Sequence, residues 1–239
     1  MKLLFRIATS LLVTVVVIYA GIFLWTKVLH PAEDKLNSDD LTAVVTDTSP
    51  QLTTEAPTQM TDPTQPSDVS GVWKATTKST LGYRVKEVLG GLDTEAVGRT
   101  DQVTGELVIE ASRLMAATFS VDVGSITSDS SKRDNQFTGN IMDVSTYPTA
   151  DFVLTTPIDF GSVPLPGVQL TAMATGDLTL HGVTRAVTFE VTTEYASNVI
   201  GVLGSIDIAF ADYGIANPSN AFVSTGDTGL LEFVLAFER

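Results

Sequence analysis

The chain contains no cysteine among its 239 residues. This absence excludes a disulfide framework, thiolate catalysis and a lipid-modified N-terminal cysteine. Histidine is scarce as well, since only His30 and His181 are present. With so few nitrogen and sulfur ligands, and no acid-rich loop spaced like a Ca²⁺ site, the sequence gives little basis for a metal centre. We expect neither a metal nor a cofactor.

Basic residues are also few. The chain has 14 lysines and arginines against 28 acidic residues, which gives a formal net charge of −14. Residues 31–69 hold one lysine against eight acids, and residues 70–239 hold ten basic against twenty acidic residues. Such an acidic chain has no electrostatic attraction to nucleic acid or to anionic lipid head groups. Both partner classes are therefore excluded.

One long hydrophobic run is present, at the N-terminus. The twenty residues Ile7–Thr26 carry no charge, and a helix of that length spans roughly 30 Å, the thickness of a bilayer core. A cleavable signal peptide has a shorter apolar region of about 7–15 residues. Tyr19-Ala20-Gly21 is a poor cleavage site, and the run continues past it. The sequence therefore predicts an uncleaved membrane anchor within residues 1–30, forming one transmembrane helix.

Charges that flank this run indicate its orientation. Lys2 and Arg6 precede it, whereas Lys27 and Lys35 follow it among several acids. Acidic residues count for little in the positive-inside rule, so the asymmetry is modest. It favours a single-pass protein of the cell membrane, with the N-terminus in the cytoplasm and the rest of the chain extracytoplasmic.

Residues 31–69 have the composition of a linker. They hold eight threonines, five prolines and eight acids. Such a segment cannot bury enough apolar area to offset the entropy of ordering it. We predict a disordered linker with a reach of about 35 Å. A plain spacer is favoured, and a sugar-decorated stalk is the alternative.

Residues 70–239 alternate apolar and polar side chains, which is typical of strands with one buried face. The clearest case is the C-terminus, where Leu231, Phe233, Leu235 and Phe237 share one face. The alternation fails between Asp129 and Pro148, where a short helix is predicted. Eight or nine strands result; they include segments at residues 72–76, 81–86, 102–110, 115–123, 150–156, 168–181, 185–194, 199–210 and 229–239.

Strands that are apolar on one face must close on themselves or stack in pairs. Eight antiparallel strands close into a barrel that is either filled by side chains or holds one small ligand. Ala172, Ala174 and Gly176 follow one another on the inward face of a long strand. These small residues are compatible with a slender ligand or with close packing. The fold class is therefore all-β, an antiparallel closed barrel with one short helix, and the alternation alone favours a filled core.

Candidate catalytic residues are few. A nucleophile–histidine–acid set would need His181 with Asp177 or Asp207. His181 ends a strand directly before Gly182, where a polar residue is more often part of a turn. A hydrolase centred on His181 is thus the weakest hypothesis, and we expect no enzymatic activity.

A second polar group is the arginine at 133 with its acidic neighbours Asp129 and Asp134. Arginine and carboxylates in such proximity form charge-assisted hydrogen bonds. A structural latch that fixes the short helix against the barrel is favoured. The alternative is a polar contact to the head group of a ligand at the barrel mouth.

Several segments of the barrel region together resemble the YceI-like family of polyisoprenoid-binding proteins. They keep the family's order over residues 71–239, and their combination is far more specific than any one of them. The segments are Gly71-Val72-Trp73, Val121–Asp129, Arg133-Asp134-Asn135-Gln136-Phe137, Tyr147–Phe152, Gly176–Arg185 and Phe210–Ile215.

The resemblance implies a lipocalin-like barrel with an apolar pore for a long isoprenoid chain, such as that of a quinone or a polyprenyl lipid. It implies a periplasmic or cell-surface carrier or sequesterer, and it replaces the filled core with a hollow one. The phase of the strands then nominates the pore lining: Tyr83, Val85, Phe119, Val121, Phe152, Leu154, Val187, Phe189, Phe210, Phe233 and Leu235. Possible polar contacts at the rim are Arg133, Asp134, His181 and Arg185.

The chain departs from the family pattern in one respect. Many relatives have a histidine in or just after the second strand, whereas Lys86-Glu87-Val88-Leu89 stands here. One polar candidate at the pore mouth is therefore lost. The competing hypothesis is a non-catalytic interaction or adhesion barrel displayed on a stalk.

Overall fold

The computed structural model describes residues 32–46, 68–220 and 223–239, together with Thr14, Val17, Ala20, Gly21 and Phe23. Most of the predicted span Ile7–Thr26 therefore lies outside the described residues. Among those residues, no helix combines the length and the apolar character needed to cross a membrane. The anchor stays a prediction from the sequence.

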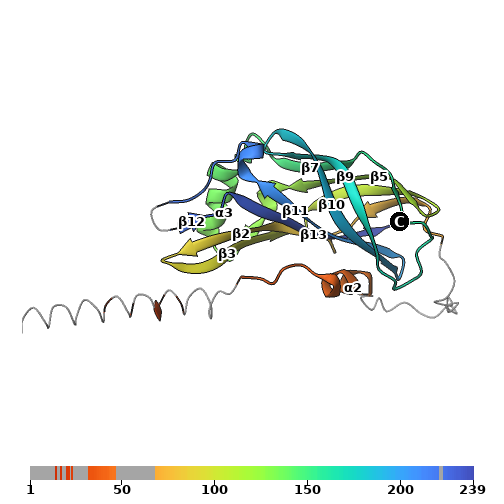
Figure 1. Ribbon diagram of the computed structural model, residues 1–239, viewed down its shortest axis with the longest axis horizontal. Helices are drawn as coiled ribbons and strands as arrows, with labels where there is room; N and C mark the ends of the chain where they lie inside the picture. Colours follow the sequence, from red (N-terminus) through yellow and green to blue (C-terminus); the bar gives the residue numbers. More distant parts are fainter. Residues whose placement is uncertain are drawn as a thin grey trace, which may run out of the picture.

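The described barrel region consists of thirteen strands in one antiparallel sheet (Figure 1). Its alternating side chains follow the period of two that the sequence shows. The strands are β1 (Gly71–Ala75), β2 (Thr80–Leu89), β3 (Leu92–Thr100), β4 (Val103–Glu110), β5 (Arg113–Asp122), β6 (Thr127–Ser128), β7 (Thr149–Leu154), β8 (Ile158–Asp159), β9 (Leu170–Leu180), β10 (Val183–Ala196), β11 (Val199–Ala209), β12 (Val223–Thr225) and β13 (Thr228–Glu238).

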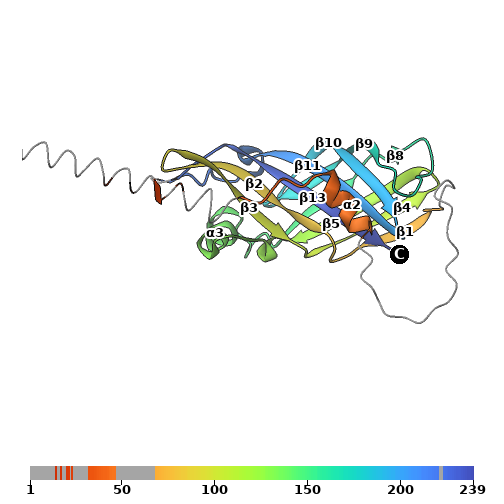
Figure 2. The same ribbon diagram turned by 90° about the horizontal axis from the view of Figure 1, so that it is seen from below.

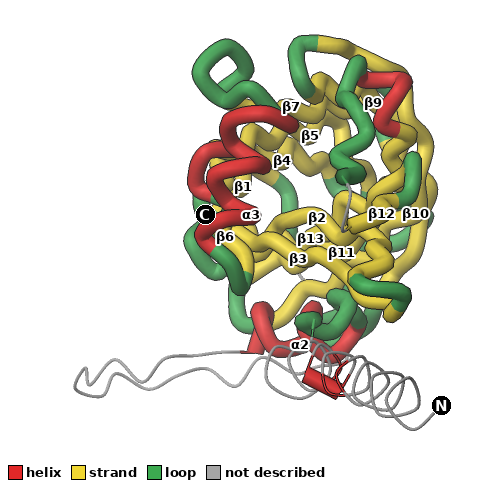
Figure 3. Tube along the Cα trace, turned by 90° about the vertical axis from the view of Figure 1, so that its left-hand side faces the viewer, coloured by secondary structure: helices red, strands yellow, loops and turns green. Residues whose placement is uncertain are grey.

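The sheet closes on itself. Its neighbours run β1-β4-β5-β7-β9-β10-β11-β13, and β13 returns to β1 through the pairs Lys74–Glu238 and Ala75–Phe237. Farther along, β13 pairs with β2, and β2 pairs with β3. Figure 3 shows the resulting ring of strands viewed from one end. The predicted closed antiparallel barrel is confirmed.

One end of the barrel carries the helical segment expected after Asp129. It consists of α3 (Ser131–Gln136) and a π-helical turn (Phe137–Ile141). The β2–β3 hairpin and β12 extend the sheet at this same end (Figure 1). We call it the α3 end. The predicted short helix is confirmed.

The opposite end is closed by aromatic packing. Trp73 is fully buried, its Nε1 donates to the Val69 carbonyl at 2.8 Å, and the Arg239 guanidinium lies 4.6 Å from its ring centre. Tyr195 meets the same ring edge-on at 6.0 Å. The indole thus seals this end, which we call the Trp73 end.

Four phenyl rings fill the middle of the barrel. Phe119 stacks on Phe152 at 5.1 Å, and Phe189 lies edge-on to Phe152 and to Phe233. A side chain at Gly176 would meet the Phe152 ring at 2.4 Å, so this strand glycine makes room for an aromatic ring. The filled core that the alternation favours is therefore correct for this part of the barrel.

Residues 32–46 differ from the predicted disordered linker. They contain helix α2 (Ser38–Thr46), whose side chains Leu41 and Val45 are buried against the outside of the barrel. Figure 2 shows α2 lying across β11 and β13. The prediction of disorder is thus wrong for this part of the linker, because two apolar side chains one helical turn apart suffice when a strand surface receives them.

Candidate functional site

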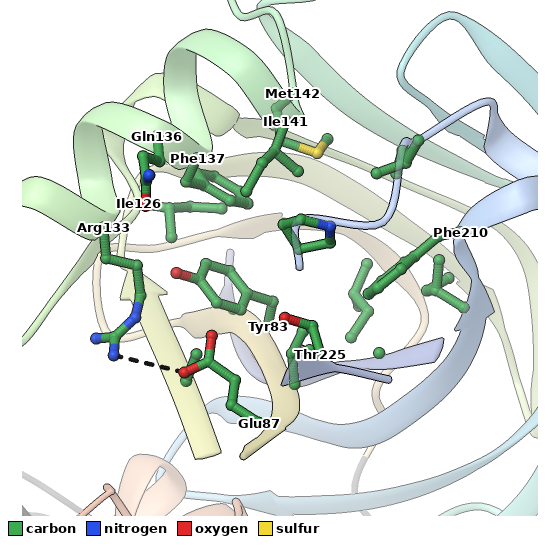
Figure 4. Close-up of a pocket in the computed structure, with 18 of the residues that line it drawn as sticks. Tyr83, Glu87, Ile126, Arg133, Gln136, Phe137, Ile141, Met142, Phe210 and Thr225 are labelled. Atoms are coloured by element: carbon green, nitrogen blue, oxygen red, sulfur yellow. Dashed lines mark ion pairs between the residues drawn. The ribbon is translucent and has the colours of Figure 1, made fainter. Parts of the chain in front are cut away.

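A cavity of about 650 Å³ occupies the α3 end of the barrel. It lies between β2, β13, the α3 segment and the loop that follows β11 (Figure 4). Its size falls within the range of small-molecule sites. Most of its lining is apolar; the apolar residues are Leu81, Tyr83, Val85, Leu89, Ala96, Val121, Val123, Ile126, Phe137, Ile141, Met142, Ala150, Leu180, Ile208, Phe210, Ile215, Pro218, Val223, Leu230 and Leu231.

Strand β2 supplies one wall. Its inward residues Leu81, Tyr83, Val85, Glu87 and Leu89 all line the cavity, as the period of a strand requires. The Tyr83 ring stacks on Phe137 with 4.6 Å between ring centres. Burial raises the pKa of the Tyr83 hydroxyl, so this group enters the cavity as a neutral hydrogen-bonding group.

Charged residues lie on one side of the cavity. Glu87 of β2 faces Arg133 of α3 at 3.9 Å (Figure 4). Arg133 also pairs with Asp129. Burial raises the pKa of Glu87, although the Arg133 charge opposes that effect. An ion pair thus connects β2 to the helical segment across the edge of an otherwise apolar chamber.

The structure divides the predicted pore residues into two groups. Tyr83, Val85, Val121 and Phe210 line the cavity. The remaining seven are core residues away from it: Phe119, Phe152, Phe189, Phe233 and Leu235 are buried, and Leu154 and Val187 pack against them. These seven do not line this cavity, because the rings among them pack against one another, and their role as pore lining stays a prediction. The cavity is thus a chamber at the α3 end, and the four packed phenyl rings in the middle of the barrel are not among its lining residues.

The predicted rim residues also separate. Arg133 lines the cavity, whereas Asp134 accepts hydrogen bonds from the backbone N–H and the hydroxyl of Ser128 at 2.8 and 2.6 Å. Arg185 donates to the Asp212 carbonyl at 3.1 Å. Asp134 and Arg185 are thus structural, and the latch hypothesis holds for Asp134.

His181 belongs to a turn. Its Nδ1 lies 3.1 Å from the Tyr213 carbonyl oxygen, and its ring packs against Tyr147. His181 and Gly182 have φ of 50° and 74° and connect the paired residues Leu180 and Val183, which is a two-residue type I′ hairpin. The predicted rim role of His181 is therefore corrected, and the turn interpretation is confirmed.

Much of the cavity wall comes from segments outside the strand pattern. Phe137, Ile141 and Met142 enter from the helical segment, and Ile215 and Pro218 enter from the loop after β11. Helical spacing signals the first three in the sequence. No periodicity marks the loop residues, so only the fold reveals them.

The chamber suits an apolar ligand with a polar group at one end. Its carbon lining favours a hydrocarbon chain, and polar lining residues such as Glu87, Arg133, Gln136 and Thr225 offer hydrogen bonds. Across the described part of the chain, no three histidine or acidic side chains are grouped as metal ligands.

Other proteins are similar in sequence to part of this chain. A UPF0312 protein of Pseudomonas putida (strain W619) is 32% identical over 123 residues, which are 48% of this chain and 60% of that protein. A UPF0312 protein of Vibrio parahaemolyticus is 33% identical over 102 residues, 40% of this chain and 50% of that protein. The matched part thus spans about 60% or less of the length of these two relatives.

Solved structures share the fold at low identity. A polyisoprenoid binding domain from Saccharophagus degradans has a TM-score of 0.57 at 20% identity, covering 70% of this chain and 97% of that domain. Burkholderia cenocepacia BcnA has a TM-score of 0.50 at 21% identity, covering 64% and 95%. The family model of the YceI-like domain matches residues 73–237, which is nearly the whole barrel. The chain therefore belongs to the YceI-like family.

Proposed function

We propose that this chain is a membrane-anchored, extracytoplasmic protein that binds an isoprenoid or other long-chain lipid in the cavity and carries or sequesters it. The apolar chamber of about 650 Å³ at the α3 end of the barrel is the observation that carries the proposal. The solved Saccharophagus degradans domain, which has a similar fold, is described as polyisoprenoid-binding. The proposal includes no catalytic step.

Burial of hydrocarbon supplies the binding energy. Each buried CH₂ contributes about 0.8 kcal/mol, so about twelve carbons contribute roughly 10 kcal/mol. Association costs about 4–15 kcal/mol, which a chain of this length offsets to a large degree. A longer chain adds more only while the chamber has room, because packed rings such as those of Phe119 and Phe233 fill the middle of the barrel.

The polar side of the cavity selects the ligand's head group. Arg133 donates hydrogen bonds, and the Tyr83 hydroxyl either donates or accepts them. A quinone-like carbonyl or a polyprenyl head group fits these partners. The long hydrocarbon tail then lies among Val85, Val121 and Phe210.

Two neighbouring positions on β2 provide a test. Val85 faces the cavity, whereas Lys86 is exposed on the other face of the strand. Val85→Trp fills the chamber, and Lys86→Trp adds the same side chain outside it. The full chain is purified from membranes, extracted with organic solvent and assayed by mass spectrometry.

We expect a stoichiometric apolar lipid with the unmodified protein and with Lys86→Trp, and a loss of at least tenfold with Val85→Trp, about 1.4 kcal/mol or more. Equal lipid in all three proteins, or no lipid in any, contradicts the proposal. A protein partner that is retained after complete delipidation would instead support the adhesion barrel.

A further inference from the structure

Part of the outer surface of the barrel, over β10, β11 and β13, is covered by residues 32–46, which we call the strap. Leu41 and Val45 of α2 are 0% and 1% exposed, and Ala236 on the outer face of β13 is 0% exposed beneath them. A side chain at Gly201 would meet Leu41 at 2.6 Å and Val45 at 2.8 Å. Gly201 on β11 thus allows the helix to lie directly on the sheet.

A buried carboxylate fastens the start of the strap. Glu232 points outward from β13, yet it is only 1% exposed. One of its oxygens is 3.1 Å from Arg84 Nε and 2.7 Å from an Arg99 nitrogen, and the other accepts from the Leu36 N–H at 3.3 Å. Arg84 also donates to the Glu33 carbonyl at 2.7 Å. The backbone of the strap therefore forms hydrogen bonds with this charged cluster on the outer face of the sheet.

A second polar contact holds the helix itself. The Thr42 hydroxyl donates to Glu194 at 2.8 Å, and the Gln169 amide donates to the same oxygen at 3.0 Å. Glu194 is 3% exposed. Apolar and polar contacts therefore fix both halves of the strap, which forms part of the folded domain.

The strap has a defined direction. Its first residues lie beside Arg84 and Arg99, within the strands that extend toward the α3 end. Its helix lies over Gly201 and Ala236, toward the Trp73 end. Figure 2 shows this course along the outside of the barrel. The chain that precedes residue 32 therefore joins the domain on the side of the cavity.

We propose that the strap holds the α3 end of the barrel, where the cavity lies, against the lipid bilayer. This inference rests on the proposed membrane anchor. Five residues lie between Thr26, the end of the predicted span, and Ala32, so the two positions can be at most about 20 Å apart. A free linker over residues 31–69 would reach about 35 Å and fix no orientation. Residues 47–67 follow α2 in the sequence, so they do not lie between the anchor and the strap.

This arrangement favours the lipid bilayer as the surface that the α3 end of the barrel contacts. Residues 70–239 hold ten basic against twenty acidic residues, so the domain has no electrostatic attraction to a membrane, and the short connection supplies the proximity. A lipid with almost no solubility in water then moves between the bilayer and the chamber without crossing the solvent.

Single cysteines can report which end faces the membrane, because the chain has none of its own. Val88 on β2, near the cavity, is 38% exposed, and Val168, near the Trp73 end, is 42% exposed. The full chain with Val88→Cys or Val168→Cys is labelled with a fluorophore and reconstituted in phosphatidylcholine vesicles that contain a nitroxide-labelled lipid. We expect severalfold stronger quenching at position 88 than at position 168.

Variants of the strap test its part in this orientation. Leu41→Asp introduces a charge into the buried contact, and Gly201→Val displaces the same contact from the barrel side. Ala43→Asp adds the same charge on the exposed face of α2. The difference between the two labels should disappear in the first two variants and persist in the third.

Equal quenching at both positions in the unmodified strap overturns the inference, as does a difference that survives both disruptive variants. Failure of the chain to float with the vesicles overturns the anchor as well. Quenching requires no bound ligand, so it is independent of lipid extraction. Lipid in the purified protein without an orientation difference leaves the proposed function standing and removes only the inference.

Discussion

The two glutamates at positions 87 and 232 show how surroundings decide the behaviour of one residue type. Glu232 has two arginines and a backbone N–H as partners. Glu87 faces the apolar cavity and has Arg133 at 3.9 Å. Burial penalises the charged form of an acid, and a nearby cation compensates this only in part. The pKa of Glu87 is accordingly raised.

Glu87 should therefore make stability depend on pH. An acid with a raised pKa in the folded state binds more protons there than in the unfolded chain, so the free energy of unfolding falls as pH rises through that pKa. We expect Glu87→Gln to be at least as stable as the unmodified protein at pH 7. Its advantage should vanish as pH falls to about 4, near the ordinary pKa of glutamate.

Urea unfolding at a series of pH values measures this difference. Glu190→Gln, on the exposed face of β10, controls for the loss of one acidic residue. A Glu87→Gln protein that is less stable than the parent at pH 7, and recovers at low pH, would show that the Arg133 pair outweighs burial.

Strand β13 is buried on both of its faces. Every residue from Leu231 to Phe237 is at most 9% exposed. The inward residues form the core, whereas Glu232, Val234 and Ala236 point outward. An outward apolar pair on a strand of a closed barrel indicates a covering element, and here part of that cover is the strap.

Truncation of the strap helix should therefore destabilise the whole domain. Leu41→Ala removes a fully buried side chain, for which we expect a loss of about 2–5 kcal/mol in the free energy of unfolding. Ala43→Ser, on the exposed face of α2, should change it by less than about 0.5 kcal/mol. Denaturant unfolding followed by Trp fluorescence compares them. A Leu41→Ala loss as small as that of Ala43→Ser would mean that the strap detaches without affecting the barrel.

The whole molecule combines a solid half and a hollow half in one sheet. Toward the Trp73 end, the indole and the phenyl rings pack as in an ordinary core. Toward the α3 end, strands, a helical segment and a loop enclose the chamber. The solid half stabilises the fold, so the hollow half can bind a ligand without providing all of the core.

Ligand and stability should consequently be linked. A ligand that binds only the folded state stabilises it by about 2.7 kcal/mol at a hundredfold excess over its Kd. We expect delipidated protein to unfold at a lower denaturant concentration, and added long-chain isoprenoid alcohol to restore the midpoint. Val85→Trp should show no response to the lipid, whereas Lys86→Trp should respond like the parent. An unchanged midpoint on delipidation contradicts this linkage.

The amino-acid sequence determined the barrel and the phase of its strands. Period-two alternation is local, so it identifies the inward residues before the fold is known. The turn at His181-Gly182 is local too, because two positive φ angles suit a hairpin of this length. The short helix after Asp129 could be expected for the same kind of reason.

Only the tertiary structure decided which inward residues enclose space. Phe152 fills the gap that Gly176 leaves on another strand, and neither residue signals the other along the chain. The strap could not be predicted for the same reason, because Leu41 and Val45 pack over Gly201, which is about 160 residues away in the sequence. Packing between distant segments determines where the barrel is solid, where it is hollow and what covers it.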